Sequence, residues 1–338
     1  MPPRIATTLT QQALVAAFGA RPFAAHEAAQ LGITRRQIEC AVEAGTLVRV
    51  HHGKYTAVEV TPRLRLRALQ SEWEGRGVQA VGGARSAADI WTIPVLGKAG
   101  PLPPSTPTLW VPPGTARPGE RGGVHYLVGN VPDEHMIRLS DGLVVTSPLR
   151  TAVDVVRLSR LPRRLALATI VGGMRAHTAY AASIDPRDAG TITQLVQDPD
   201  VRADLTRQLA DVAARCPSWG MSSVRACLSV ADPRLENALE AISFGRFLDA
   251  GVPLPAPQVW LRGASGRWWR VDFWWDALGI IGEADGMVKY ANRQDLLDEK
   301  FRQLDLEASG RSLHRWGWGN AIRDDDPLMG QFVELLRQ

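Results

Sequence analysis

The hydrophobic pattern of residues 11–57 predicts three short helices followed by a β-hairpin. The runs QQALVAAF (11–18) and FAAHEAAQLG (23–32) have helical spacing, and a glycine ends the second run. The third helix starts at a capping box formed by Thr34 and Gln37 and stops at Gly45. Two β-rich runs around His52 follow it. Helices and hairpin in this order are typical of a winged helix-turn-helix domain.

Basic residues on the outer side of this segment favour DNA binding. Arg35 and Arg36 lie in the first turn of the third helix, where their side chains and the helix dipole can both meet phosphate. The alternative is a small helical domain that docks a protein and has solvated arginines. The basic stretch 61–70 either extends the DNA-binding surface or forms an amphipathic linker helix. The hairpin adds further candidate DNA contacts: Arg49, His51, His52 and Lys54.

The middle of the chain reads as a small mixed sheet with helices. Residues 71–150 are rich in Pro and Gly and contain short β-type runs, and helical patterns at 150–158 and 163–175 are expected to pack on that sheet. A less ordered stretch is expected at 181–200, before further helices. The expected fold class is therefore α/β (α+β). The expected domains are a winged helix at 1–60, a middle α/β domain at 61–180, a helical linker at 181–230 and a C-terminal domain at 231–338.

Acidic residues gather at the ends of apolar runs in the C-terminal part. An amphipathic helix at 232–251 carries Glu236 and Glu240 one turn apart, and three β-type runs at 258–263, 267–275 and 279–286 predict an antiparallel meander. Alternation puts Glu283 and Asp285 on one face of the third strand, and the turn before it brings Asp272 opposite Glu283. Carboxylates this close repel each other, so they need a proton, a lysine or a divalent cation.

Magnesium or manganese is the expected cation, because both prefer oxygen ligands and keep waters that a phosphate can displace. Such a site predicts metal-assisted phosphodiester hydrolysis. The alternative is that Asp272 caps a turn and the other acids lie exposed at a strand end. The predicted ligands are Asp272, Glu283 and Asp285, with Glu236 in support, Lys289 on the water or phosphate, and Lys300 on phosphate.

Composition narrows the remaining functions. The chain has 338 residues, a net charge of +4 and three widely spaced cysteines, which fits two or three domains, permits an anionic partner and argues against a disulfide framework. The histidines lack zinc-ligand spacing, and the nucleotide-binding and dinucleotide-binding fingerprints are absent, so zinc, nucleotide and redox cofactors are not expected. The longest apolar stretch, 165–174, is about half a membrane span, and the start MPPRIATTLTQQ has no leader pattern. These features predict a soluble cytoplasmic protein.

The C-terminal motifs resemble a known superfamily over roughly 230–325. Glu236 on a helix, Asp272 on a strand and then Glu283-Ala284-Asp285-Gly286 resemble the PD-(D/E)xK, restriction-endonuclease-like superfamily, and in particular its very-short-patch-repair-like (Vsr-like) domains. The resemblance implies a central mixed sheet flanked by helices, Mg²⁺-dependent DNA cleavage, metal ligation by Asp272 and Glu283, and a supporting Glu236. The sequence departs from the pattern at Asp285, where the superfamily usually has lysine, and Lys289 follows four residues later.

The front of the chain resembles another family. LGITRRQIECAVEAGTLVRVHHGKYTA (31–57) looks like the winged helix of AbiEi-type antitoxins, and the stretches 85–91 and 146–157 resemble the domain that follows it. Such antitoxins repress their own transcription. The sequence therefore predicts a DNA-binding protein with a metal-dependent endonuclease-like domain and, as partner protein, a toxin or a repair or defence factor. The alternative is a non-catalytic DNA-binding autorepressor, the antitoxin of a type IV toxin-antitoxin system.

Overall fold

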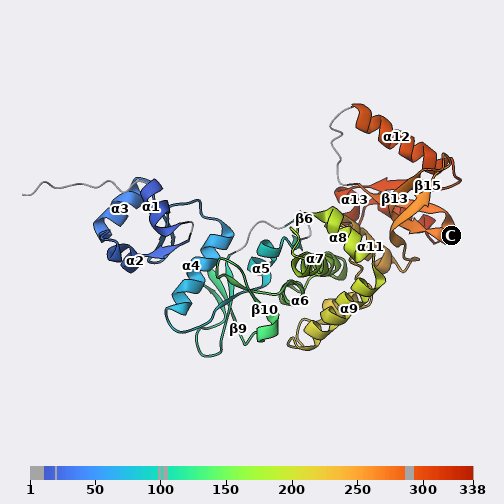
Figure 1. Ribbon diagram of the computed structural model, residues 1–338. Helices are drawn as coiled ribbons and strands as arrows, with labels where there is room; N and C mark the ends of the chain where they lie inside the picture. The colour runs from blue at the N-terminus through green and yellow to red at the C-terminus, as the bar shows by residue number, and fades with distance from the viewer. Residues whose placement is uncertain (1–10, 20, 98–99, 102–105, 286–292, 338) are drawn as a thin grey trace, which may run out of the picture. The chain divides into compact units, whose positions relative to one another are not determined.

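The computed structural model of the chain describes residues 11–19, 21–97, 100–101, 106–285 and 293–337. The chain divides into two compact units, Met1–Ile90 with Pro104–Ser147, and Trp91–Pro103 with Pro148–Gln338. Each unit combines helices and sheet strands, so the protein belongs to the predicted α/β class (Figure 1). Among the described residues, no helix has both the length and the apolar character needed to cross a membrane.

The first unit begins with the predicted helices and hairpin. These elements are α1 (Gln11–Phe18), β1 (Phe23–Ala24), α2 (Ala25–Gln30), α3 (Arg35–Glu43), β2 (Val48–His51) and β3 (Lys54–Thr56), and the strands pair in the order β1-β3-β2. Thr34 and Gln37 form the predicted capping box at α3. Buried Leu14, Phe23 and Ile38 lie in the core between the helices and the small sheet. The hydrophobic pattern therefore predicts the three helices and the hairpin, but it does not predict β1, whose residues were expected to begin the second helix.

The rest of the first unit contains the predicted mixed sheet. Helix α4 (Pro62–Glu74) precedes it, and α5 (Ala84–Trp91) leads out of the unit. The strands lie in the order β10-β11-β4-β7-β9-β8, with β11·β4 and β7·β9 parallel and the other pairs antiparallel. The strands are β4 (Val81–Gly82), β7 (Thr108–Val111), β8 (Gly119–Arg121), β9 (Val124–Val128), β10 (Met136–Arg138) and β11 (Val144–Thr146), with a 3-10 turn at Asp133–His135.

Helices dominate the first half of the second unit. They are α6 (Pro148–Ser159), α7 (Arg163–Ala181), α8 (Ala189–Val196), α9 (Pro199–Ala214) and α10 (Ser222–Leu228), and the short strands β5 (Leu96–Gly97) and β6 (Gly100–Pro101) accompany them. Helix α7 packs against α6, α8 and α10. The boundary at Ser147 therefore falls inside the predicted middle domain, 61–180. The stretch predicted to be less ordered, 181–200, contains α8, whose N-cap Asp188 accepts a hydrogen bond from the Thr191 amide.

The second half of this unit is built on a four-stranded sheet of order β12-β13-β14-β15. The predicted antiparallel meander is confirmed for β12 (Ala256–Arg262), β13 (Trp268–Trp275) and β14 (Ile280–Ala284), whereas β15 (Ser312–Trp316) runs parallel to β14. The accompanying helices are α11 (Ala238–Ala250), α12 (Arg293–Glu307), α13 (Trp318–Ile322) and α14 (Pro327–Leu335), with a 3-10 turn at Asp276–Leu278. The sheet is therefore mixed, with two antiparallel strand pairs and one parallel pair.

Aromatic packing holds α11 and α14 against this sheet. Phe247 of α11 makes edge contacts with Phe273, Trp275, Trp316 and Phe332, at ring-centroid distances of 5.1–6.0 Å. Glycine at position 282 is required by the same core, because a Cβ there would lie 2.6 Å from Trp316 and 2.9 Å from Trp275. These aromatic side chains therefore fix α11 and α14 relative to the strands.

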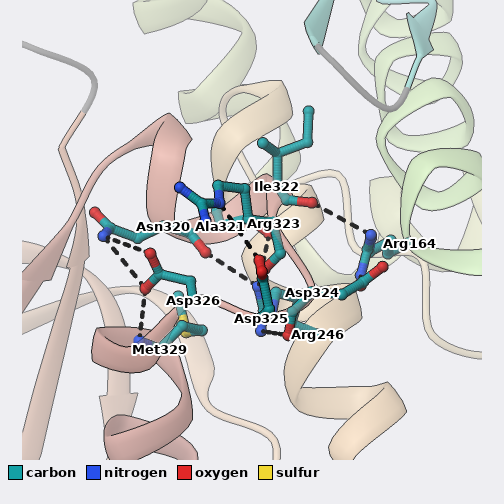
Figure 2. Close-up of polar contacts among 10 residues, drawn as sticks. All are labelled: Arg164, Arg246, Asn320, Ala321, Ile322, Arg323, Asp324, Asp325, Asp326 and Met329. Carbon is teal, nitrogen blue, oxygen red and sulfur yellow. Dashed lines mark hydrogen bonds and ion pairs between the residues drawn. The ribbon is translucent and has the colours of Figure 1, made fainter.

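The last residues of α13 are fastened to two other helices of the same unit (Figure 2). Arg246 of α11 donates hydrogen bonds to the carbonyl oxygens of Asn320 and Ala321, at 3.0 and 3.3 Å, and Arg164 of α7 donates to the carbonyl of Ile322 at 3.3 Å. Asp326 caps α14 by accepting from the Met329 amide at 3.0 Å. These contacts hold the chain that follows β15 and so help to position the sheet under α11.

Candidate carboxylate site

Asp272 and Glu283 meet on adjacent strands, as the sequence predicts. Strand β13 pairs with β14 so that Phe273 lies opposite Gly282, which makes Asp272 and Glu283 the next residues in register. One carboxylate oxygen of Asp272, Oδ2, accepts a hydrogen bond from the Ala284 amide at 3.0 Å. Burial and then the charge of Glu283 raise the pKa of Asp272 to about 6. The β-hairpin thus forces two carboxyl groups into one largely dry location.

A third carboxyl group, that of Glu240, comes from the first turn of α11. Its side chain is only 2% exposed and accepts hydrogen bonds from the Glu236 amide, at 2.8 Å, and from the Asn237 side chain. Burial, and then the charge of Asp272, raise the pKa of Glu240 to about 8. The helix begins here because Asn237 caps the amides of Leu239 and Glu240. Glu240 therefore belongs to the site, although the sequence favoured Glu236.

Gln258 of β12 joins these two acids. Its Nε2 donates to Oε2 of Glu240 at 3.0 Å and to Oδ1 of Asp272 at 3.1 Å, and the side chain is 3% exposed. Its backbone has φ of 55°, which is rare for a non-glycine residue in a strand and costs about 1–3 kcal/mol. Its neighbours Pro257 and Val259 pair with Phe273 and Val271 of β13, so Gln258 lies opposite Asp272. An amide thus separates the two carboxylates without adding charge.

Glu283, in contrast, is compensated by two arginines. Arg302 of α12 contacts both of its carboxylate oxygens, and Nε of Arg315 of β15 lies 3.3 Å from Oε2. Glu299 of α12 pairs with the same two arginines, at 3.1 Å from the Arg302 Nε. Burial raises the pKa of Glu283 while the positive charges of Arg302 and Arg315 oppose the rise. The cluster contains two carboxylates and two guanidinium groups, so its charges balance.

Glu236 does not lie on the helix, which corrects the prediction. Helix α11 starts at Ala238, so Glu236 precedes the N-cap Asn237 and its carboxylate is 2.7 Å from Nη1 of Arg270 on β13. The pattern 232–251 was read as one continuous helix because its apolar residues keep helical spacing across the cap. Asn237 followed three residues later by Glu240 is the N-terminus signal that would have located the start.

The remaining predicted residues lie around the edge of this cluster or outside it. Asp285 lies just after β14, half-buried, and its amide donates to the Trp316 carbonyl at 2.9 Å. Lys289 lies outside the described residues. Lys300 is exposed on α12. Within the described ranges, no group of three His, Cys, Asp or Glu residues is arranged to hold a metal ion, and the triad Asp272, Glu283 and Asp285 is not assembled as such.

The predicted DNA-contacting residues of the first unit lie on the surface of α3 and of the β2–β3 hairpin. The Arg35 side chain is 88% exposed and pairs only loosely with Glu39, at 3.1 Å and one turn away, and Arg36 and His52 are also exposed. Arg49 donates to the Tyr55 hydroxyl at 3.3 Å, and Lys54 is half-buried beside it. Exposed ion pairs such as Arg35–Glu39 contribute little to stability, so Arg35 can exchange its partner for a phosphate.

Four contributors to the site had no clear sequence signal. They come from three elements, and the sheet order and the placement of α12 bring them to the acids: Gln258 of β12, Glu299 and Arg302 of α12, and Arg315 of β15. Glu240 lies one turn after Glu236 in the sequence, but the predicted site contains Glu236 and not Glu240. Pattern analysis finds residues that share a strand or helix, whereas partners far apart in the chain depend on tertiary packing.

Comparison with known proteins finds relatives but no family. No family model matches the chain. Two proteins of Mycobacterium tuberculosis are similar to it, the uncharacterized proteins MT2308 of strain CDC 1551 / Oshkosh and Rv2248 of strain ATCC 25618 / H37Rv. Each is 29% identical over 279 residues, which cover 82% of this chain and 88% of the relative. The matched length exceeds either compact unit, so the similarity includes residues of both units.

Proposed function

We propose that the protein binds DNA through α3 and the β2–β3 hairpin and hydrolyses phosphodiester bonds at the carboxylate site with a divalent cation. The observation that carries the hydrolytic part is the pair Glu240 and Asp272. Glu240 is buried and Asp272 is half-buried, both have raised pKa values, and the neutral amide of Gln258 bridges them. Buried like charges held in this way favour a proton or a cation between them.

The donor atoms fit Mg²⁺ or Mn²⁺. Both ions take hard oxygen ligands, and Glu240 and Asp272 supply carboxylate oxygens from a helix and a central strand. When bound, the cation would lower the pKa of a water and offset negative charge on the phosphate. Glu240 and Asp272 would hold it. Glu283 lies next to this pair and keeps its arginines in place.

Arg302 and Arg315 supply the positive charge that the motif lacks at Asp285. Their guanidinium groups lie against Glu283, and their side chains remain 18% and 25% exposed. A planar guanidinium binds phosphate oxygens through paired hydrogen bonds, so each can hold the substrate phosphate with the edge that faces away from the acids. In the proposed site these arginines orient the phosphate, with Lys289 and Lys300 as further predicted contacts.

The first test is cleavage of DNA by the purified full chain. Supercoiled, linear, single-stranded and mismatched DNA are incubated with Mg²⁺ or Mn²⁺, beside EDTA. Asp272→Asn keeps the shape of the side chain but removes its charge, so we expect it to lose cleavage by about a hundredfold or more. Asp211→Asn, an exposed change on α9, is the matched control and should cleave like the wild type. Cleavage that resists EDTA or survives Asp272→Asn would refute this site.

One observation favours a second function, that of a non-catalytic DNA-binding autorepressor or antitoxin. Glu283 is fully compensated by Arg302 and Arg315, and Asp285 replaces the lysine of the motif. A domain that had lost catalysis would keep such a balanced cluster for stability. Absence of cleavage on every substrate, together with tight duplex binding and repression of the protein's own promoter, would support this function in place of hydrolysis.

A further inference from the structure

Gln258 combines three properties that ordinary strand residues do not share. It is buried, it adopts a positive φ of 55°, and one nitrogen of its amide bonds to carboxylates from two other elements. Strained backbone at a non-glycine residue persists only where the surroundings over-determine it, and such residues concentrate at functional sites. A glutamine that only filled core space would have no need of this conformation.

The chemistry of the amide explains why glutamine suits this position. A lysine or arginine in the same place would pair with Glu240 and Asp272 and cancel their charge, as Arg302 and Arg315 do for Glu283. An apolar residue would leave both acids without this donor. The amide donates to one oxygen of each acid and brings no positive charge of its own to the pair.

We infer that Gln258 is the positioning residue of the cation site: it fixes the separation of the Glu240 and Asp272 carboxylates while keeping them uncompensated for a divalent cation. The inference rests on the proposed function for the identity of the ligand. It adds a role for β12, which contributes no acid to the site. Gln258 itself acts through the two acids and touches neither substrate nor reacting atoms.

Two substitutions separate positioning from simple packing. Gln258→Met keeps the length of the side chain and removes the donor, so Mn²⁺ binding measured by isothermal titration calorimetry should weaken about tenfold or more. Gln258→Lys supplies a compensating cation, so it should abolish Mn²⁺ binding while the metal-free melting temperature stays equal or rises. Gln194→Met, an exposed change on α8, is the control and should bind Mn²⁺ like the wild type.

The outcomes distinguish the inference from the proposed function. Wild-type affinity for Mn²⁺ in Gln258→Lys would overturn the positioning role while leaving the metal site intact. A wild type that binds no Mn²⁺ would overturn the metal-dependent function instead. In that case the bridge by Gln258 is tested by NMR without metal. The side-chain amide resonances of Gln258 are assigned as those that disappear in Gln258→Met. Their protection from hydrogen exchange should be lost in Asp272→Ala or Glu240→Ala, and exchange as fast as that of Gln194 in the wild type would refute the bridge.

Discussion

Glu240 and Asp272 differ from Glu283 in how the fold treats their charge. Glu240 and Glu283 are buried and Asp272 is half-buried, and within the described ranges Glu283 alone of the three forms ion pairs with arginines. Sequence alternation predicted that Asp272 and Glu283 would face each other, and the strand register confirms it. The apolar spacing continues across Asn237, so the pattern favoured Glu236 over Glu240, although Asn237 followed three residues later by Glu240 marks the start of the helix. For single residues, strand periodicity therefore predicted the position of the side chain correctly, whereas the predicted start of the helix was wrong.

The raised pKa of Glu240 predicts how stability depends on pH. Its carboxyl group is protonated more readily in the folded chain than in the unfolded chain, so folding is favoured below the ordinary value of 4.5 and loses this contribution as pH rises through about 8. Glu240→Gln is neutral at every pH in this range. Between about pH 5 and 8, the free energy of unfolding of the metal-free variant should therefore fall by on the order of 2–4 kcal/mol less than that of the wild type. Urea unfolding across this range measures the difference. Parallel pH profiles for wild type and variant would contradict the assignment.

At the scale of elements, local sequence predicted α3 and its capping box well. The helix begins at Arg35 as expected, because Thr34 and Gln37 satisfy each other's backbone amides without any distant partner. Helix α8 was missed, since its flanks are rich in Asp, Pro and Gly and its short apolar stretch has little periodic signal. A capping box before a periodic apolar run was therefore predictive for α3, whereas the short helix α8 was not predicted although Asp188 caps it.

The exposed arginines of α3 predict a salt-dependent interaction with duplex DNA. Arg35→Ala combined with Arg36→Ala should weaken binding and reduce the slope of log K against log salt by about one unit for each phosphate that the variant no longer neutralises. Fluorescence anisotropy at several salt concentrations measures this slope. Arg117→Ala with Arg121→Ala removes the same charge from another exposed part of the first unit and is the control. An unchanged slope in the α3 variant, or an equal decrease in the control, would remove α3 from the interface.

At the scale of the whole molecule, the chain consists of two compact units whose boundary the sequence did not locate. The predicted ranges 61–180, 181–230 and 231–338 do not coincide with the units, because α6 and α7 pack with α9, α10 and α11 of the second unit. The sequence predicts the apolar faces of α6 and α7, but an apolar face does not show which other element it packs against. Composition and periodicity bound the number of domains, whereas long-range packing decides their limits.

Separate units predict separable activities. Hydrolysis of the small diester bis(4-nitrophenyl) phosphate with Mn²⁺ needs only the carboxylate site, so Arg35→Ala with Arg36→Ala should retain it within about twofold. Asp272→Asn should lose this hydrolysis and keep wild-type affinity for duplex DNA. Absorbance of released nitrophenolate and anisotropy of labelled duplex give the two readouts on the same preparations. Loss of both activities in either variant would show that the units do not act independently.

By itself the sequence determined the α/β class, the helices and hairpin at 11–57, the antiparallel meander and the pairing of Asp272 with Glu283. These features depend on local periodicity, caps and turns, which neighbouring residues specify. Tertiary structure decided the rest of the site: the amide of Gln258 that bridges Glu240 and Asp272, and the arginines that compensate Glu283. Those contacts join residues 14 or more positions apart, and their energy depends on burial and mutual distance, which only the folded chain defines.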